Sequence, residues 1–378
     1  MHTMQPTLLV GPSDWDATRM PREEFLARAT ALWKSAPAAA GAIVYGDRAH
    51  HAELAYLTHF TPKLEAALAL IPRVGAPQLL VGGGANMLQA AKPLTFIENL
   101  RPLREVGKTV AQWVREQSGG GRPVLIGGAF MPHALRSALE VELAEGQIRI
   151  ADKTADLQQM MRRKSARELG NIRDACATLD AAVKAMGEAQ RAGAGATAAV
   201  LAGEHAAYQR GGQDVRTLFS TDGGRSLRPF DTPAEQAIDP LQVYVAVRQH
   251  GYWAEGFAML ASAPSPCVRG AGDVLQYAIE TIRPGQRCGD LARVIAEAIV
   301  PLSPHPVTAQ APGNGIGLAL AEQPLIAASS EDAIETDEVL SLRLGVTDGR
   351  DHAIASAVLA VHAYGCEVLW SSPADGAA

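Results

Sequence analysis

Apolar side chains recur every three or four residues along one long stretch of the chain, between Leu169 and Met186. This spacing places them on one face of a helix, so we expect a helix over residues 165–191. A shorter helix over 155–164 precedes it, and another is expected over 198–210. Amphipathic helices bury their apolar faces against other elements, so we expect further helices or strands to pack on these.

Strand patterns follow these helices. Two apolar runs flank His250 and Gly251, which predicts a β-hairpin. Because helices come first and a mainly antiparallel sheet follows, the sequence predicts an α+β domain over residues 155–378. The expected segments are strands over 241–248, 252–263, 338–346 and 353–361 and helices over 268–282 and 288–300.

The first part of the chain alternates between helix and strand patterns, which predicts an α/β domain over residues 1–154. Turn residues separate the segments, with glycines at 82–84 and 119–121. Neither glycine group has the spacing of a phosphate-binding loop. The expected segments are helices over 22–33, 106–117 and 132–142 and strands over 42–45, 54–57, 66–72, 78–81, 123–126 and 147–150.

Composition narrows the classes of partner. A formal net charge of −6 and only 5% aromatic residues argue against nucleic acid as a partner. No uncharged run approaches the length of a membrane-spanning helix, and residues 1–5 lack the basic start of a secretory signal. The four cysteines lie far apart, as is usual for free thiols in a reducing compartment. We therefore expect a cytoplasmic protein whose partner is a small-molecule substrate.

Several short segments, taken in order, resemble the creatinase and aminopeptidase P group of the pita-bread hydrolases, which also includes methionine aminopeptidase. The resemblance implies a creatinase N-terminal-like α/β domain followed by a pita-bread domain, and a homodimer. The segments are Ala-Tyr-Leu-Thr-His-Phe at 55–60, Met-Arg-Arg-Lys-Ser-Ala-Arg-Glu-Leu at 161–169, Ile-Arg-Pro-Gly at 282–285, Gly-Asn-Gly-Ile-Gly-Leu at 313–318 and Glu-Gln-Pro at 322–324.

The metallopeptidases of this group hold two divalent ions with two aspartates, one histidine and two glutamates. Only one of the matching positions carries a carboxylate here, and another carries a cation, which repels metal ions and attracts anions. The resemblance therefore predicts that no dinuclear centre forms, and we expect no metal and no cofactor. The matching positions are Tyr244, Glu255, Asn314, Arg343 and Ala355; a register shifted by two residues puts Ala246 first.

Creatinase hydrolyses a C–N bond on this scaffold without metal, with a histidine as base. The matching segment, 223–231, contains no histidine, so that mechanism does not transfer. It does contain Arg228, a candidate for binding an anion, and Asp231, a candidate acid or base. His305 lies in the loop region that carries the family's histidine, and it is a candidate for substrate binding.

In creatinase relatives, the N-terminal domain of one subunit reaches towards the active site of the other. Phe60 and Lys63 lie on the matching segment and are candidates for substrate binding, although a plain surface loop also fits the sequence.

Two functions remain open for the positions that have lost their ligands, and the first is the leading hypothesis because polar residues replace most of those ligands. One is a metal-independent hydrolase acting on a C–N bond of a small polar, anionic substrate. Glu255 would then be the base or a substrate clamp, Tyr244 an acid, and Arg343 and Asn314 the substrate-binding groups. The other is a non-catalytic protein that binds a small molecule, peptide or protein partner. Glu255 and Arg343 would then form a buried ion pair that fills the former metal position.

Overall fold

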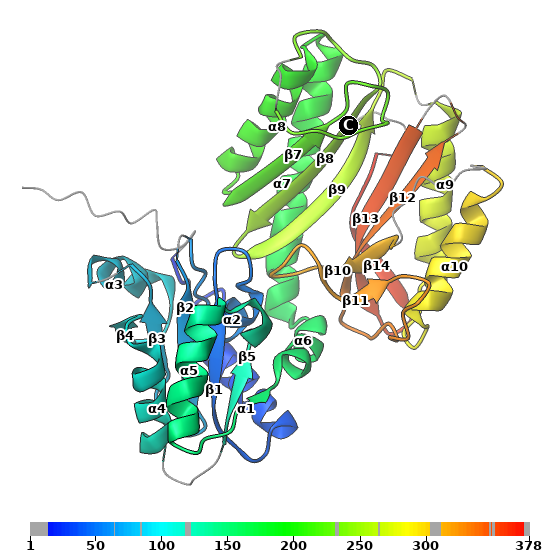
Figure 1. The fold of residues 1–378 in the computed structure, drawn as a ribbon. Helices are drawn as coiled ribbons and strands as arrows, with labels where there is room; N and C mark the ends of the chain where they lie inside the picture. Colours follow the sequence, from blue (N-terminus) through cyan, green and yellow to red (C-terminus); the bar gives the residue numbers. More distant parts are fainter. Residues whose placement is uncertain are drawn as a thin grey trace, which may run out of the picture. The chain divides into compact units, whose positions relative to one another are not determined.

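Figure 1 shows a computed structural model of the chain, which divides into two compact units, Met1–Met161 and Arg162–Ala378. The boundary expected from the sequence, after residue 154, stays a prediction. Each unit is built on sheets of its own. The structure describes residues 14–63, 65–83, 85–117, 122–230, 234–263, 265–302, 311–347, 349 and 352–373.

The first unit is built on a six-stranded mixed sheet in the order β4-β3-β2-β1-β5-β6. Its inner strand β1 runs antiparallel to β2 and parallel to β5. Both neighbouring strands are as apolar and buried as β1, as expected for strands covered on two faces. The strands are β1 (Ala39–Gly46), β2 (Ala67–Pro72), β3 (Gln78–Val81), β4 (Asn99–Pro102), β5 (Arg122–Ile126) and β6 (Ala151–Asp152).

Helices of the first unit supply the rest of its core. Trp113 of α4 and Leu139 of α5 belong to one apolar cluster with Ile43 and Leu70 of the central strands. This arrangement confirms the α/β class expected for the N-terminal part. The helices are α1 (Arg22–Ser35), α2 (Ala52–Thr58), α3 (Ala85–Ala91), α4 (Val106–Glu116), α5 (His133–Glu145) and α6 (Thr154–Arg162).

Two expected strands of the first unit are wrong. Residues 54–57 lie in helix α2, whose residues are all buried, and a short run that is apolar on every side has no period to separate helix from strand. Residues 147–150 form no strand, because the backbone N–H groups of Gln147 and Ile148 donate to the last carbonyls of α5. Only Ala151–Asp152 then pairs with β5.

The long amphipathic helix is confirmed as α7 (Ala166–Arg191). It begins with a capping box, in which the Ser165 side chain accepts from the backbone N–H of Glu168 and the Glu168 side chain accepts from that of Ser165. The apolar face of α7 packs against α8 (Ala196–Gln209) and against two strands of the second unit, β8 (Leu241–Gln249) and β9 (Tyr252–Leu260).

The second unit contains two antiparallel sheets. One is the confirmed hairpin with a third strand, in the order β7-β8-β9, and the other has the order β11-β10-β12-β13-β14. Strand β9 lies beside β13, so the two sheets adjoin there. The strands are β7 (Asp214–Phe219), β8 (Leu241–Gln249), β9 (Tyr252–Leu260), β10 (Gly313–Gly315), β11 (Glu322–Ile326), β12 (Val339–Thr347), β13 (His352–His362) and β14 (Gly365–Ser371).

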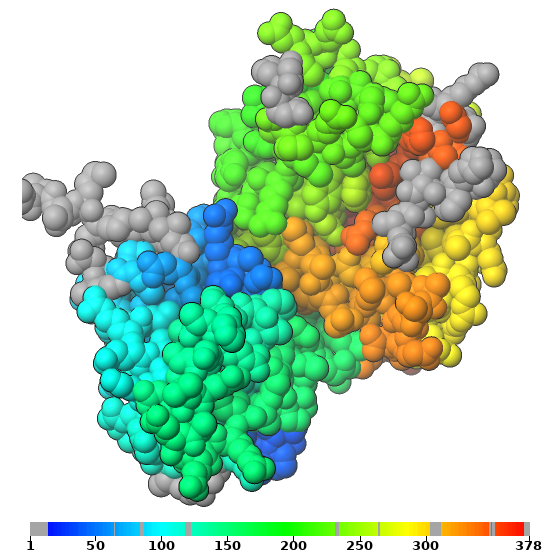
Figure 2. All heavy atoms as spheres, viewed as in Figure 1, coloured from blue at the N-terminus to red at the C-terminus, as the bar shows by residue number. Residues whose placement is uncertain are grey.

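Two helices, α9 (Pro266–Thr281) and α10 (Cys288–Ile299), cover one face of the five-stranded sheet through a large apolar cluster. The yellow segment with α10 lies at the surface of the second unit in the space-filling view (Figure 2). Within the described ranges, no helix is both long enough and apolar enough to span a membrane.

Candidate functional site: a polar network between two sheets

Strand register places two of the candidate residues on one face of the hairpin. Ala246 pairs directly with Glu255, and Tyr244 lies two residues earlier on the same strand. Side chains two residues apart share a face, so Tyr244 and Glu255 point the same way. The Tyr244 hydroxyl reaches diagonally and donates to Oε2 of Glu255 at 2.6 Å. The Tyr244 register therefore gives a bonded pair, whereas Ala246 offers no polar group.

The neighbouring sheet supplies the other partners of Glu255. Ser341 and Arg343 lie two residues apart on β12, and Asn314 of β10 pairs with Ser341, so all three share a face. The Ser341 hydroxyl donates to Oε1 of Glu255 at 2.8 Å, and Nη1 of Arg343 donates to the same oxygen at 3.1 Å. Nη2 of Arg343 donates to Oδ1 of Asn314 at 2.7 Å. We call Tyr244, Glu255, Asn314, Ser341 and Arg343 the polar network.

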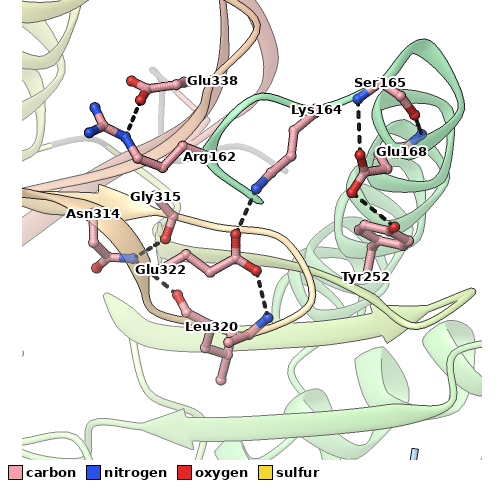
Figure 3. Close-up of polar contacts among 11 residues, drawn as sticks. Arg162, Lys164, Ser165, Glu168, Tyr252, Asn314, Gly315, Leu320, Glu322 and Glu338 are labelled. Atoms are coloured by element: carbon pink, nitrogen blue, oxygen red, sulfur yellow. Dashed lines mark hydrogen bonds and ion pairs between the residues drawn. The ribbon is translucent and has the colours of Figure 1, made fainter. Parts of the chain in front are cut away.

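Asn314 is held in one orientation by its own surroundings. Its Nδ2 donates to the carbonyl oxygens of Gly315, at 2.7 Å, and Leu320, at 3.0 Å (Figure 3). Two acceptors at the nitrogen leave Oδ1 as the atom that faces Arg343. The amide thus directs an acceptor towards the cation, which a histidine at this position would not do once its ring nitrogen was protonated.

Buried ion pairs fix the segments around Asn314 (Figure 3). Nζ of Lys164 donates to Oε2 of Glu322 at 2.6 Å, and the side chains are 4% and 8% exposed. Oε1 of the same carboxylate accepts from the backbone N–H of Ala319 at 3.0 Å. A buried pair is costly to break, because the remaining charge loses its partner. Glu322 therefore has a positioning role for the loop that carries Leu320.

The start of α7 is tied to the hairpin in a similar way. Besides its part in the capping box, Glu168 accepts a hydrogen bond from the Tyr252 hydroxyl at 3.1 Å (Figure 3). Close by in the sequence, Nε of Arg162 donates to Oε1 of Glu338 at 2.6 Å, with both side chains buried. These contacts tie the start of α7 to β9 and the last residue of α6 to the residue before β12.

The charges in the polar network balance. Glu255 carries one negative charge and Arg343 one positive charge, and their side chains are 7% and 28% exposed. Burial, together with the charge of Glu255, raises the pKa of Tyr244, so its phenol stays protonated and donates. The carboxylate accepts from three donors, which leaves one of its roughly four lone-pair positions.

A second cation lies on the same face of the hairpin sheet. Arg216 of β7 pairs with Ala246, and its guanidinium lies 4.6 Å from the ring centroid of Trp253. The aromatic face and Asp214, whose carboxylate accepts from Arg216 at 3.2 Å, hold it in place. Arg216 was not among the candidates. In the sequence, Arg216 lies two residues from both Asp214 and Leu218, and this spacing does not distinguish it from an ordinary surface arginine.

Register corrects one expected position. Arg343 pairs with Ser356, whereas Ala355 pairs with Leu344 and belongs to the apolar cluster under α9 and α10. Ser356, not Ala355, therefore faces β9, where its hydroxyl accepts from the backbone N–H of Phe257 at 2.7 Å. Ser341, the other residue that was missed, alternates with Arg343 along β12, and that alternation would have revealed it.

The other candidates lie apart from the polar network. Arg228 is exposed, and its described contacts are backbone hydrogen bonds with Phe219. Phe60 is 1% exposed, so its side chain is not available to a second subunit, which corrects the role expected for it. Lys63 is exposed, and its role stays a prediction. Asp231 and His305 lie outside the described residues.

Comparison with known proteins identifies the family. The model of metallopeptidase family M24 matches residues 170–363, so the chain belongs to this family. No curated protein matches the chain.

Solved structures share the fold across nearly the whole chain, at low identity. X-Pro aminopeptidase from Thermotoga maritima MSB8 is 16% identical, with a TM-score of 0.72, and the match covers 90% of this chain and 99% of that one. Prolidase from Pyrococcus horikoshii OT3 is 15% identical, with a TM-score of 0.74, and the match covers 93% of this chain and 99% of that one. Dipeptidase PepE from Mycobacterium ulcerans is 19% identical, with a TM-score of 0.71, and the match covers 96% of this chain and 98% of that one. The fold is thus confirmed as a creatinase N-terminal-like domain followed by a pita-bread domain.

The family name implies a metal, and the donor set can be tested against it. A dinuclear site needs several carboxylates or imidazoles that neutralise two divalent ions. The polar network offers one carboxylate, which already accepts from three donors, and it contains a guanidinium. Throughout the described part of the chain, no three His, Cys, Asp or Glu side chains gather as metal ligands. The residues of the network do not fit a dinuclear centre.

Proposed function

We propose that this chain is a metal-independent member of family M24 that binds a small polar molecule through an anionic group at the polar network. The partly exposed guanidinium of Arg343 is the observation that carries this proposal. Among the described residues, it donates through two of its five N–H groups, to Glu255 and Asn314. The remaining donors suit a carboxylate or another planar anion.

The charge of the network supports the metal-independent part of the proposal. Arg343 pairs with Glu255 at 3.1 Å, so an incoming divalent ion would have to displace a cation from the one carboxylate present. Arg216 lies on the same face of the sheet, where it pairs with Asp214. Neither guanidinium can coordinate a metal ion, whereas the partly exposed Arg343 can donate to an anion.

Binding without catalysis is the form of the function that the geometry supports best. A general base must present an oxygen lone pair to the water that it deprotonates. Glu255 accepts three hydrogen bonds and is only 7% exposed. The bonds stabilise Glu255 as a fixed counter-charge for Arg343.

Hydrolysis of a C–N bond is the second candidate, and membership of a metallopeptidase family favours it. In this form Arg343 and Asn314 would hold the anionic substrate. Glu255 would use its remaining lone pair to take a proton from the attacking water. The protonated phenol of Tyr244 would donate a proton to the leaving nitrogen.

A binding experiment tests the first form. Small carboxylic acids are screened by their effect on the melting temperature, and each hit is titrated by calorimetry. We expect Arg343→Met to weaken binding at least about tenfold, as for the loss of a charged hydrogen bond. Arg293→Met is the matched control, because Arg293 is exposed and pairs only with Asp290 among its described contacts. Equal binding by both variants would contradict the proposal.

Two further measurements separate the remaining alternatives. Turnover of amide, amidine or ureido compounds that is lost in Glu255→Gln would favour hydrolysis over binding alone. Metal analysis of purified protein tests independence from metal. About two equivalents of manganese, zinc or cobalt per chain, the content of a two-metal site, would contradict it.

The assembly and location of the protein belong to the same proposal. We expect a homodimer in the cytoplasm, in keeping with the resemblance to creatinase relatives. Light scattering coupled to size-exclusion chromatography would give twice the mass of the chain. A mass equal to that of one chain would remove the homodimer from the proposal.

A further inference from the structure

A cavity of about 430 Å³ lies in the second unit, between α9 and the strands β9, β13 and β14. Its lining includes Met259, Leu275, Ala353 and Val368 and contains no member of the polar network. The volume falls within the range of small-molecule sites, which are concave and mainly apolar. The cavity is therefore a separate feature of the fold.

One residue of the cavity wall, in the middle of α9, has no side chain. Gly272 lines the cavity, and a Cβ atom built on it would meet no other atom within 4 Å. An alanine would fit there without a clash and would favour the helix, because glycine is the poorer helix former. Gly272 therefore leaves open space in the wall of the cavity, which a larger side chain such as leucine would occupy.

The rim of the cavity is charged, in contrast to its wall. Arg269, Asp273 and Gln276 follow one another at helical spacing along α9, all exposed and all lining the cavity. Residues four apart on a helix are neighbours, so one positive and one negative group stand side by side at the entrance. Met259, Leu275 and Ile279 line the apolar wall next to this pair.

We propose that this cavity binds a small zwitterion with an apolar side chain, of the class of the apolar α-amino acids. Arg269 pairs with the carboxylate and Asp273 with the ammonium group, while the apolar side chain enters the cavity past Gly272. The charges and the apolar wall match these three parts of the ligand. The site does not depend on the function proposed for the polar network.

Calorimetric titration of the full chain with L-leucine and L-phenylalanine tests this proposal. We expect saturable binding, and we expect Gly272→Leu to weaken it at least about tenfold by filling the cavity. Gly170→Leu is the matched control. Gly170 also lies in a helix, has open space around its Cβ position and does not line the cavity. Its affinity should stay within about twofold of the wild type, as for independent sites.

The two rim charges are tested with truncated ligands. 4-Methylpentanoate lacks the ammonium group and 3-methylbutan-1-amine lacks the carboxylate, so each should bind at least about tenfold more weakly than L-leucine. Arg269→Gln should weaken L-leucine but not the amine. Gly272→Leu should leave the binding of carboxylic acids at the polar network unchanged, which separates the two sites. Absence of saturable binding to the wild type, or equal binding by Gly272→Leu, would overturn the proposal.

Discussion

The guanidinium of Arg343 on β12 donates to the carboxylate of Glu255 on β9 at 3.1 Å, across two sheets that adjoin without a shared hydrogen-bonded ladder. The hydroxyl groups of Ser341 and Tyr244 are the other donors to this carboxylate. The stability of the second unit should therefore respond to the charges of this pair.

Loss of the cation should destabilise the fold. Arg343→Met leaves Glu255 buried without its counter-charge, and we expect a decrease of about 1–3 kcal/mol in the free energy of unfolding, less than for a fully buried pair because Arg343 is partly exposed. Adding Glu255→Gln removes the uncompensated charge and should restore part of the loss. Urea unfolding of the two single variants and the double variant measures this coupling, and additive effects would show that the pair is not coupled.

The network positions should accept metal again when ligands are restored. The combined change Tyr244→Asp, Asn314→His, Arg343→Glu and Ser356→Glu, with Glu255 retained, brings four carboxylates and an imidazole onto the facing strands. We expect this variant to keep manganese or cobalt after dialysis. The control carries Ala355→Glu in place of Ser356→Glu. Its fourth carboxylate would point into the apolar cluster, so it should bind less metal or fail to fold. Equal metal content in the two variants would refute the register assigned to β13.

Gly256 should not tolerate a side chain. A Cβ atom at this position would lie 2.1 Å from the ring of Trp370, which is itself buried. We expect Gly256→Ala to destabilise the protein by about 1–3 kcal/mol, the usual cost of overpacking. Thermal unfolding of the two single variants and the double variant measures this. Trp370→Leu should destabilise the Gly256→Ala variant less than it destabilises the wild type. Gly170→Ala, in open space on α7, should be neutral or stabilising.

Alkaline pH should weaken the fold through Tyr244. Burial and the charge of Glu255 raise the pKa of this phenol above its ordinary value near 10. In the unfolded chain the phenol ionises as the pH rises through that ordinary value, whereas in the fold it stays protonated. The stability from its hydrogen bond is therefore complete below about pH 10, and it declines as the pH rises from there towards the folded pKa. The difference in unfolding free energy between wild type and Tyr244→Phe should shrink from pH 8 to pH 11. A constant difference would contradict this assignment.

Patterns of apolar residues were sufficient for the long elements of the fold. The spacing from Leu169 to Met186 predicted α7, and the two runs around His250 and Gly251 predicted the hairpin of β8 and β9. Strands β4, β7, β10, β11 and β14 were missed. They are short or lie at sheet edges with mixed exposure, so they lack the clear alternation of a half-buried strand.

The candidate site divides in the same way. Family motifs pointed to Tyr244, Glu255, Asn314 and Arg343, which the structure brings into one network. Ala355 was chosen in place of Ser356 because the family alignment was wrong by one residue. Side chains alternate between the two faces of a strand, so a shift of one residue selects the opposite face. Ser341 has no family motif either, but its alternation with Arg343 along β12 marks it in the sequence. Arg216 has neither signal, and only tertiary contacts bring it to Trp253.

The balanced charge of the polar network has a consequence for how the protein matures. An enzyme with a dinuclear centre leaves the ribosome with clustered carboxylates that repel one another until two ions are delivered. Here the positive charge of Arg343 balances the negative charge of Glu255, and both residues belong to the chain itself. Under the proposed metal-independent function, this chain reaches its finished state in a cell starved of manganese or zinc, and its abundance should not follow the supply of either metal.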